Sequence, residues 1–263
     1  MTQSTTPTLP DESAAVPPVN YTYRGEGSGW FQATAWRIGQ VFFQFIAVLM
    51  FQMRARGREN IAPRGGALLV TNHQSFLDPW LIGVPLWRQI HYMARETLFR
   101  GGFWQWMLES TNAFPIRRGR ADSSAIREAI SRLDRGFLVN VFPEATRSPD
   151  GTIGPIASGV AIIVRRSNVP VVPVVIDGAF EAWPRGQMFP HFFRPIKLIY
   201  GEPIAHETLA KLSADEVSVR IREAMIKLQE QIHSPHAAAS RSRLTDDLAR
   251  GRRRLVVAEE LSA

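Results

Sequence analysis

A histidine and an aspartate lie five residues apart in the stretch NHQSFLD, residues 72–78, which directly follows the apolar run GALLVT. This spacing puts the two side chains on different faces of a regular helix and on opposite faces of a strand. His73 and Asp78 therefore meet only if the chain turns between them. If they meet, Asp78 would fix the imidazole tautomer and leave the other ring nitrogen of His73 to act as a general base.

The same stretch also carries the signal of a helix start. Ser75 and Asp78 match S-x-x-D, an acidic relative of the capping box, and Pro79 suits the first turn of a helix. In the simpler interpretation Asp78 only caps that helix. The two interpretations share one geometry, because a helix that begins at Ser75 supplies the turn that brings Asp78 back to His73.

Three arginines follow a short apolar run in FPIRRGR, residues 114–120. Arginine side chains at the carboxyl end of a strand can bind a phosphate through forked hydrogen bonds. Surface arginines after a strand are also common. Arg117, Arg118 and Arg120 are therefore candidates for a phosphate site, with a solvated surface as the alternative.

A glutamate and an arginine stand three residues apart in VFPEATRS, residues 141–148, again after an apolar run. An internal ion pair that pins the loop is one interpretation of Glu144 and Arg147. As a site, the pair would offer a cation for phosphate and a carboxylate that binds a substrate hydroxyl.

Short apolar runs alternate with helical stretches over most of the chain, which predicts an α/β fold with a mostly parallel central sheet flanked by helices. Catalytic residues of such sheets collect at the carboxyl ends of the strands. The expected strands are 66–72, 90–95, 112–116, 137–142, 169–176 and 196–201, with helices near 76–87, 97–110, 121–135, 158–167 and 206–232.

Two prolines interrupt the apolar run NVPVVPVVIDG, residues 168–178. Proline has no amide donor, so Pro170 and Pro173 argue against a fully paired central strand. We expect an edge strand, or a strand entered through Pro170 and bulged at Pro173.

Residues 29–54 form a hydrophobic, helix-length segment with a narrow polar stripe of Arg37, Gln40 and Gln44. The longest uncharged stretch, 38–53, has 16 residues, whereas a membrane span needs about 20. We expect a membrane-associating helix that lies in the interface, and two tryptophans near its start agree with that position. A helix packed on the protein's own core is the alternative.

The two ends of the chain predict tails around a single domain at 55–232. Residues 1–28 are expected to be a disordered tail, because they are rich in proline and polar residues and lack the basic start and apolar core of a secretory signal. Residues 233–263 form a basic tail with RGRRR, without aromatic residues that would stack on nucleic acid bases. The net charge of +7 favours an anionic partner, and the absence of cysteine excludes a thiolate metal site and a cysteine nucleophile.

Taken together, the four clusters resemble the ordered motifs of the glycerolipid acyltransferase family, which includes bacterial 1-acyl-glycerol-3-phosphate acyltransferase. Its blocks N-H-x-S-x-x-D, F-I-x-R, F-P-E-G-T-R-S and V-P-[VI]-x-P are similar to NHQSFLD, FPIRR, FPEATRS and VPVVP here, in the same order. The resemblance covers about residues 60 to 180. It implies an acyltransferase fold with a hydrophobic N-terminal segment on the membrane.

The resemblance also implies roles for residues. His73 would be the general base and Asp78 its partner. Arg118, Glu144 and Arg147 would bind the phosphate and glycerol of the acceptor, with Arg117 as an added cation at a position that is often aspartate. Members transfer a fatty acyl group from a coenzyme A or acyl carrier protein thioester without a covalent enzyme intermediate, so neither a cofactor nor a metal is expected.

Two further departures concern the phosphate site. Ala145 stands where the third block has glycine, which puts a backbone torsion in question. Ile156 and Ala157 replace a phenylalanine and a lysine of many relatives. The absence of that lysine leaves the choice of acceptor open.

The sequence thus predicts an enzyme of phospholipid biosynthesis that converts 1-acyl-glycerol-3-phosphate to phosphatidate, at the cytoplasmic face of the membrane as a peripheral or monotopic protein. Its partners would be a lysophospholipid acceptor, acyl-CoA or acyl carrier protein, and the membrane surface. The alternatives are another lysophospholipid or lyso-aminolipid acceptor, or a catalytically silent lipid-binding module. Nucleic acid is not expected as a partner.

Overall fold

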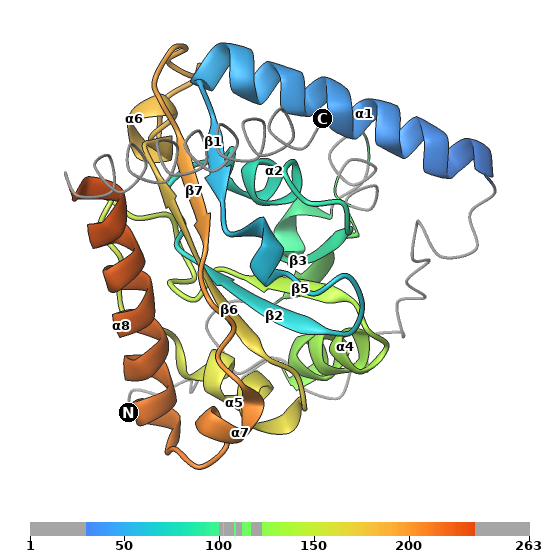
Figure 1. Ribbon diagram of the computed structural model, residues 1–263, viewed down its shortest axis with the longest axis vertical. Helices are drawn as coiled ribbons and strands as arrows, with labels where there is room; N and C mark the ends of the chain where they lie inside the picture. Colours follow the sequence, from blue (N-terminus) through green and yellow to red (C-terminus); the bar gives the residue numbers. More distant parts are fainter. Residues whose placement is uncertain (1–29, 100–101, 103–107, 109–111, 117–122, 235–263) are drawn as a thin grey trace, which may run out of the picture.

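A seven-stranded sheet forms the centre of the computed structural model, which describes residues 30–99, 102, 108, 112–116 and 123–234. The predicted tails, most of the helix expected at 97–110, and Arg117, Arg118 and Arg120 lie outside these residues. The strand order is β1-β7-β6-β2-β5-β3-β4 (Figure 1). The strands are β1 (Arg54–Arg56), β2 (Ala67–Thr71), β3 (Ile90–Arg95), β4 (Phe114–Ile116), β5 (Leu138–Val141), β6 (Val171–Asp177) and β7 (Lys197–Tyr200).

Five neighbouring strands, β6, β2, β5, β3 and β4, run parallel, while β7 is antiparallel to β6 and carries β1 parallel to itself at the edge. The predicted α/β class with a mostly parallel sheet is therefore confirmed. Strand β1 was not predicted, because its sequence RAR has the two charged side chains that suit an exposed edge.

Helices cover both faces of the sheet and bury a separate apolar core on each. One core contains residues of α1, α2 and α6, and the other contains residues of α4, α5, α7 and α8. Alternate residues of the central strands belong to opposite cores, as the pleat requires: Leu69 faces the first, and Leu68 and Val70 face the second. The helices are α1 (Trp30–Phe51), α2 (Asp78–Gly83), α4 (Ser123–Asp134), α5 (Ser158–Arg166), α6 (Ala179–Ala182), α7 (His206–Leu209) and α8 (Ala214–His233), with short 3-10 turns at Arg58–Asn60 and Glu96–Leu98.

Strand β6 lies between β7 and β2, so the prediction of an edge strand or a bulge is wrong. Its register with β2 is continuous, and Leu68 donates a hydrogen bond to the carbonyl of Pro170. By the alternation of a parallel pair, the nitrogen of Pro173 then faces β7 rather than β2. The carbonyl of Pro173 accepts from the amide of Gly201, which lies one residue beyond the end of β7. Pro173 therefore lacks its amide hydrogen at a position where no residue of β7 stands opposite it.

The helix expected at 206–232 is two helices. The turn α7 ends at Leu209, and Ser213 starts α8 with a capping box: its hydroxyl accepts from the amide of Glu216, whose carboxylate accepts from the amide of Ser213. The apolar period continues across the break, which explains why periodicity alone did not reveal it.

Helix α1 turns part of its polar stripe toward the protein. The Gln40 amide donates to the carbonyls of Gly83, Val84 and Leu86 at the end of α2, and Arg37 donates to the carbonyl of Trp87 at 2.7 Å. Its carboxyl end is anchored in the core. The apolar side chains of the outer face are exposed: Ile38, Val41, Phe42, Phe45, Val48 and Leu49.

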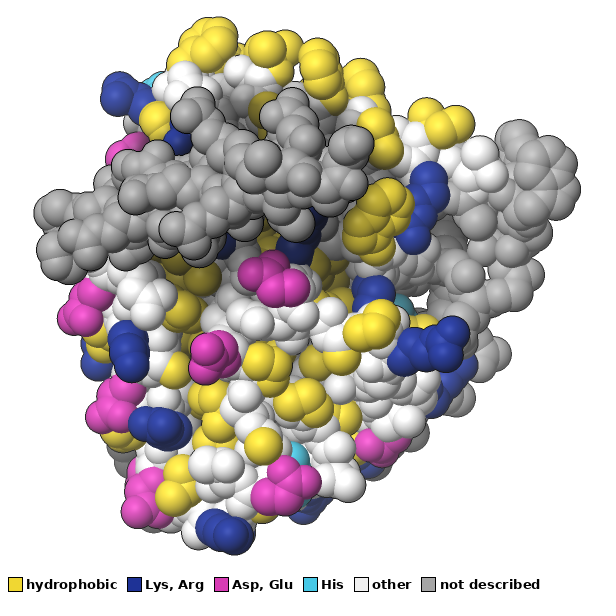
Figure 2. Space-filling model, in the orientation of Figure 1, with side chains coloured by type: hydrophobic (Ala, Val, Ile, Leu, Met, Phe, Trp, Pro, Cys, Tyr) yellow, Lys and Arg dark blue, Asp and Glu magenta, His cyan; other side chains and the backbone are white. Residues whose placement is uncertain are grey.

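Figure 2 shows hydrophobic side chains gathered along the upper edge of the molecule, where Figure 1 places α1. Among the described residues no helix has both the length and the apolar character needed to cross a membrane. Part of α1 thus packs on the protein's own core, and the rest exposes an apolar face.

Candidate active site

His73 and Asp78 meet at the carboxyl end of β2. The Nδ1 atom of His73 lies 2.8 Å from Oδ2 of Asp78, with the imidazole 14% exposed and the carboxylate fully buried. A carboxylate accepts, so Nδ1 carries the proton and Nε2 is left as the basic nitrogen. The turn that the spacing required is present.

Asp78 also caps the turn that brings it back. Its Oδ2 atom accepts from the amides of Gln74 at 2.6 Å and Ser75 at 2.7 Å, while Ser75 Oγ accepts from Leu77 and donates to the Trp183 carbonyl. Helix α2 itself begins at Asp78, three residues later than the capping signal predicted. One carboxylate oxygen of Asp78 thus both binds the amides of the turn and contacts His73, so Asp78 does more than cap.

His73 follows one of three strand ends that side chains tie together. Asn72 donates to the carbonyl of Ile176 in β6 at 2.9 Å and accepts from its amide at 2.8 Å. Thr71 donates to the side chain of Asn140 in β5 at 2.6 Å. All three polar side chains are fully buried, so their bonds are shielded from water and fix the relative positions of β6, β2 and β5.

The ring of His73 stacks on Phe142 with 4.1 Å between centroids. The carbonyl of His73 accepts from the amide of Ser148, and Gln74 donates to the carbonyl of Gly151 at 2.7 Å. Thus the loop that follows β5 is bonded directly to the loop that follows β2. The sequence predicted this convergence from the shared edge of parallel strands.

Glu144 and Arg147 form no ion pair with each other or with another described residue, so the pinned-loop interpretation is wrong. Burial raises the pKa of the Glu144 carboxyl to about 7, and the charges of Asp78 and Asp150 act in the same direction. Hydrogen bonds with the backbone of His73 and Gly154 partly offset this increase in the pKa. The Oε1 atom of Glu144 is buried without a described partner.

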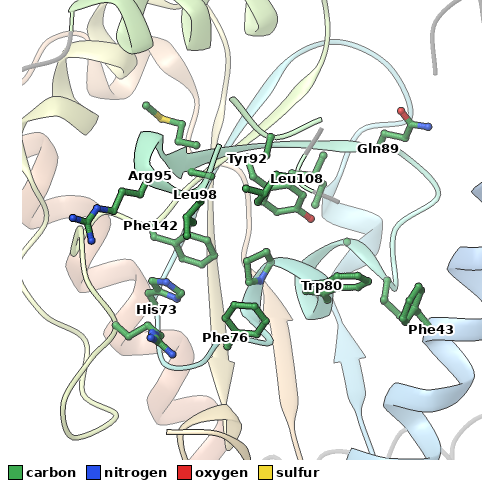
Figure 3. A pocket seen from close by; sticks show the side chains of 18 of the residues that line it. Phe43, His73, Phe76, Trp80, Gln89, Tyr92, Arg95, Leu98, Leu108 and Phe142 are labelled. Atoms are coloured by element: carbon green, nitrogen blue, oxygen red, sulfur yellow. The ribbon is translucent and has the colours of Figure 1, made fainter. Parts of the chain in front are cut away.

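A cavity of about 520 Å³ opens at His73 and runs between α2, β3 and α1. Figure 3 shows His73, Phe142 and Arg95 at one end, and Phe43, Trp80 and Gln89 at the other. The wall between them is largely apolar, with Phe76, Pro79, Met93, Ala94, Leu98 and Leu108. None of the described lining residues is acidic, whereas Arg88, Arg95, Arg147 and Arg185 are basic.

Arg88 differs from the other three arginines. Its guanidinium donates to the carbonyls of Ala62, Gly65 and Gly136, so it fastens backbone segments. Arg95, Arg147 and Arg185 have no acidic partner in the described part of the chain. These three guanidiniums remain available for an anionic ligand near His73. Among the described residues, no cluster of three or more His, Asp or Glu side chains has the arrangement of a metal site.

Comparisons with known proteins point to one family. The model of the acyltransferase family matches residues 52–177. A 1-acyl-sn-glycerol-3-phosphate acyltransferase of Bacillus subtilis is 29% identical over 66% of this chain and 84% of its own length. The crystal structure of the 1-acyl-sn-glycerophosphate acyltransferase PlsC of Thermotoga maritima superposes with a TM-score of 0.61 at 26% identity, over 76% of this chain and 82% of that one. These likenesses support the glycerolipid acyltransferase family for this chain.

The family predicted from the sequence is thus confirmed, and the protein is an acyltransferase enzyme. A chloroplast 1-acyl-sn-glycerol-3-phosphate acyltransferase of Brassica napus is also similar, at 28% identity over 72% of this chain. The chain spans 58% of that relative's length.

This acyltransferase departs from the family pattern at three described positions, Ala145, Ile156 and Ala157. Ala145 has φ 59°, so it retains the left-handed backbone that the usual glycine would adopt without strain. Ala157 is exposed at the start of α5, and its amide donates to the carbonyl of Pro143 in the loop that carries Glu144. A lysine at 157 would therefore begin next to this loop, where the present side chain offers no cation.

Sequence reasoning missed several residues of the acyltransferase site. Asn72 is the first residue of the motif NHQSFLD, but its bonds to β6 could not be predicted because they depend on which strands are neighbours. Arg95 and Arg185 carry no local signal beyond their charge. The backbone amides of Gln74 and Ser75 are bound to Asp78, so they are not free to act as oxyanion donors.

Proposed function

We propose that the protein transfers a fatty acyl group from an acyl-CoA or acyl carrier protein thioester to the free hydroxyl of 1-acyl-glycerol-3-phosphate, giving phosphatidate. The observation that carries the proposal is the His73–Asp78 pair at the mouth of an apolar cavity with arginines free to bind phosphate. The names of the relatives point to the same acceptor.

In this reaction Nε2 of His73 takes the proton of the acceptor hydroxyl while the alcohol oxygen attacks the thioester carbonyl carbon. The new C–O bond forms, the C–S bond breaks, and the proton passes from the imidazolium to the departing thiolate. Asp78 stabilises the imidazolium through Nδ1. A base placed in this way typically contributes about 10²- to 10⁴-fold to the rate.

The acceptor's phosphate would bind to Arg147, together with Arg117 and Arg118, whose sequence follows β4. Glu144 would bond the glycerol portion, since its buried Oε1 has no described partner. Holding the phosphate fixes the reacting hydroxyl near the thioester, and such positioning lowers the barrier by converting a bimolecular encounter into an intramolecular one.

The apolar length of the cavity suits the acyl chain of the donor. Its volume of about 520 Å³ lies within the range of about 300–1,000 Å³ for small-molecule sites. The exposed outer face of α1 would lie in the membrane interface, where the lipid substrates reside. The exposed face of α1 supports a peripheral or monotopic protein, and the cytoplasmic face is part of the proposal.

An acceptor panel tests the proposal. Purified protein in detergent micelles is given acyl-CoA or acyl carrier protein thioester with 1-acyl-glycerol-3-phosphate, with lysophospholipids that carry other head groups, and with a lyso-aminolipid. Transfer to the first acceptor with either donor supports the proposal. Absence of transfer to every phosphate-bearing acceptor overturns it.

A second acceptor class has one observation in its favour. The exposed Ala157 supplies no cation beside the loop of Glu144, where many relatives have lysine. Preferred transfer to another lysophospholipid or to a lyso-aminolipid would select this alternative. Loss of transfer in His73→Ala, with lipid binding retained, separates both enzymes from a silent lipid-binding module.

A further inference from the structure

Large apolar side chains are exposed in the aromatic loop, defined here as residues 185–194, which joins α6 to β7. The exposed fractions are 79% for Met188, 72% for Phe189, 51% for Phe192 and 64% for Phe193. Scattered apolar residues are ordinary on a protein surface, but four within six positions form a patch that indicates a binding surface.

We propose that the aromatic loop is a second lipid-binding element, which inserts into the headgroup region of an anionic bilayer beside α1. The inference rests on the proposed function in one respect, namely that the enzyme works on lipid at a membrane. It adds a contact that the hydrophobic N-terminal segment does not provide.

The loop is held in a defined shape against the end of α1. The amide of Phe193 donates to the carbonyl of Met50 at 2.6 Å, the amide of His191 donates to the carbonyl of Ala182 at 2.6 Å, and the ring of Phe192 lies 5.9 Å from that of Phe51. These bonds join the loop to α1 on one side and to α6 on the other. The apolar side chains are therefore presented by an anchored backbone.

Phe193 has φ 62°, a left-handed conformation that is unfavourable for a bulky side chain. The hydrogen bond from its amide to the Met50 carbonyl holds the backbone there. Strained residues of this kind collect at ligand-binding sites. The Phe193 ring is 64% exposed to solvent, although burying it would be more favourable.

The loop and α1 both expose apolar side chains, and the two elements are neighbours. In Figure 1 the segment before β7 rises beside the carboxyl end of α1, and Figure 2 shows hydrophobic side chains along that same upper edge. The bond between Phe193 and Met50 makes the two elements direct neighbours. A bilayer can contact both at once.

The charges of the loop select an anionic surface. Residues 185–197 contain Arg185, Arg194 and, at the start of β7, Lys197, and no acid. In the sheet register Lys197 lies between Arg54 of β1 and Asp177 of β6, so the basic residues outnumber the one acid beside them. Cations next to an apolar insertion hold anionic headgroups in place, and their contribution falls with salt. An acidic protein such as a carrier of acyl groups is the competing occupant, and the test below includes it.

The test compares the full-length protein with the variant Met188→Ser/Phe189→Ser. Phe192 is left unchanged because its ring packs against Phe51. Binding is measured by co-sedimentation with vesicles of phosphatidylglycerol and phosphatidylcholine. We expect about tenfold weaker binding, because two exposed apolar side chains no longer enter the bilayer. Val219→Ser on α8, also an exposed apolar position, is the matched control and retains wild-type binding.

A second variant tests the charges without touching the apolar side chains. Arg194→Gln/Lys197→Gln is expected to weaken binding to anionic vesicles several-fold and to leave binding to pure phosphatidylcholine vesicles unchanged. Thermal melting of every variant checks that the fold is kept, and these exposed positions should leave it unchanged.

Wild-type vesicle binding by the serine variant overturns the inference. So does a variant that binds vesicles normally but loses affinity for acyl carrier protein, which would assign the loop to that partner. Failure of the proposed function is a different result, namely no acyl transfer by the wild type in detergent micelles. The serine variant should keep wild-type transfer in micelles, because its two side chains line no part of the cavity.

Discussion

The two ends of the cavity are built by different parts of the fold. At one end His73, Phe142 and Arg147 come from loops that follow neighbouring parallel strands, and buried side chains tie those strands together. At the other end Gly39 and Phe43 come from α1, a helix whose outer face is exposed. The sheet thus fixes the groups proposed to react, whereas a surface helix closes the space proposed for the acyl chain.

We expect the two ends of the cavity to govern different properties of the enzyme. Changes at the sheet end should alter the rate constant or the binding of the phosphate. Changes at the α1 end should alter which acyl chain is transferred. The predictions below test that division, beginning with the largest effect.

Replacing His73 by alanine removes the base and should lower kcat by about 10²- to 10⁴-fold. Binding to lipid vesicles should remain, because the imidazole is only 14% exposed. Steady-state assays with the proposed acceptor measure the first effect and co-sedimentation measures the second. A variant with more than a tenth of wild-type kcat would exclude His73 as the base.

Replacing Arg147 by glutamine removes one cation from the His73 end. We expect KM for a phosphate-bearing acceptor to rise about 10- to 100-fold, the equivalent of one lost charge-assisted hydrogen bond, with a smaller change in kcat. Arg165→Gln is the control, since Arg165 is exposed on α5 and does not line the cavity. An unchanged KM in Arg147→Gln would remove Arg147 from the phosphate site.

Replacing Gly39 by leucine adds a side chain at the α1 end. Gly39 lines the cavity and has open space around the position of a Cβ atom, so the new side chain can occupy volume that a long acyl chain would use. The ratio of kcat/KM for long over shorter donors should fall about tenfold, the value of roughly two buried methylenes. Gly39→Ala controls for the gain in helix propensity. An equal loss for all chain lengths would contradict the assigned role of this end.

Replacing Glu144 by glutamine tests the pKa of this carboxyl. The ordinary pKa is 4.5 and the folded value is about 7, so between these values the folded protein holds a proton that the unfolded chain has lost. Wild-type stability should therefore fall as pH rises from about 4.5 to about 7 through this group.

The glutamine variant lacks that loss, so by pH 8 its free energy of unfolding should exceed that of the wild type by about 1 kcal/mol. The expected difference is smaller than the pKa shift alone implies, because the carboxyl is partly exposed. Denaturant titrations of both proteins at pH 5 and pH 8 measure the difference. An equal difference at the two pH values would show that Glu144 titrates normally.

Replacing Ala145 by glycine should have the smallest effect. Relief of the left-handed backbone at φ 59° outweighs the greater freedom of glycine in the unfolded chain, so we expect a gain of about 0.5–1 kcal/mol in unfolding free energy. Thermal and denaturant melts at pH 7 measure it. A loss of stability would mean that the surrounding loop already accommodates the alanine.

The sequence was most informative where chemistry and local geometry coincide. The meeting of His73 with Asp78 followed from a helix-start signal, which is encoded by neighbouring residues. The convergence of the loops after β2 and β5 followed from the rule that parallel strands end at a common edge. Both inferences need only short-range patterns and the fold class.

The errors arose where pairing between distant segments decides the outcome. Pro173 was expected to exclude a central strand, but its nitrogen faces the point where β7 has ended, which depends on the register of two strands. The polar stripe of α1 was predicted only from its pattern along the helix. The partners of Arg37 and Gln40, which are carbonyls at and after the end of α2, depend on how the two helices pack. The roles of Arg117 and Arg118 stay predictions, because they lie outside the described residues.

Thr71 and Asn72, which precede His73 in the chain, bond to β5 and β6 respectively. The backbone that carries His73 is therefore part of the sheet. The correct position of His73 consequently exists only once three strands from distant parts of the chain have paired. Site assembly and sheet formation are then a single cooperative event. During refolding, catalytic activity should return on the time course of the central sheet, and no partly folded intermediate should release or activate a thioester prematurely.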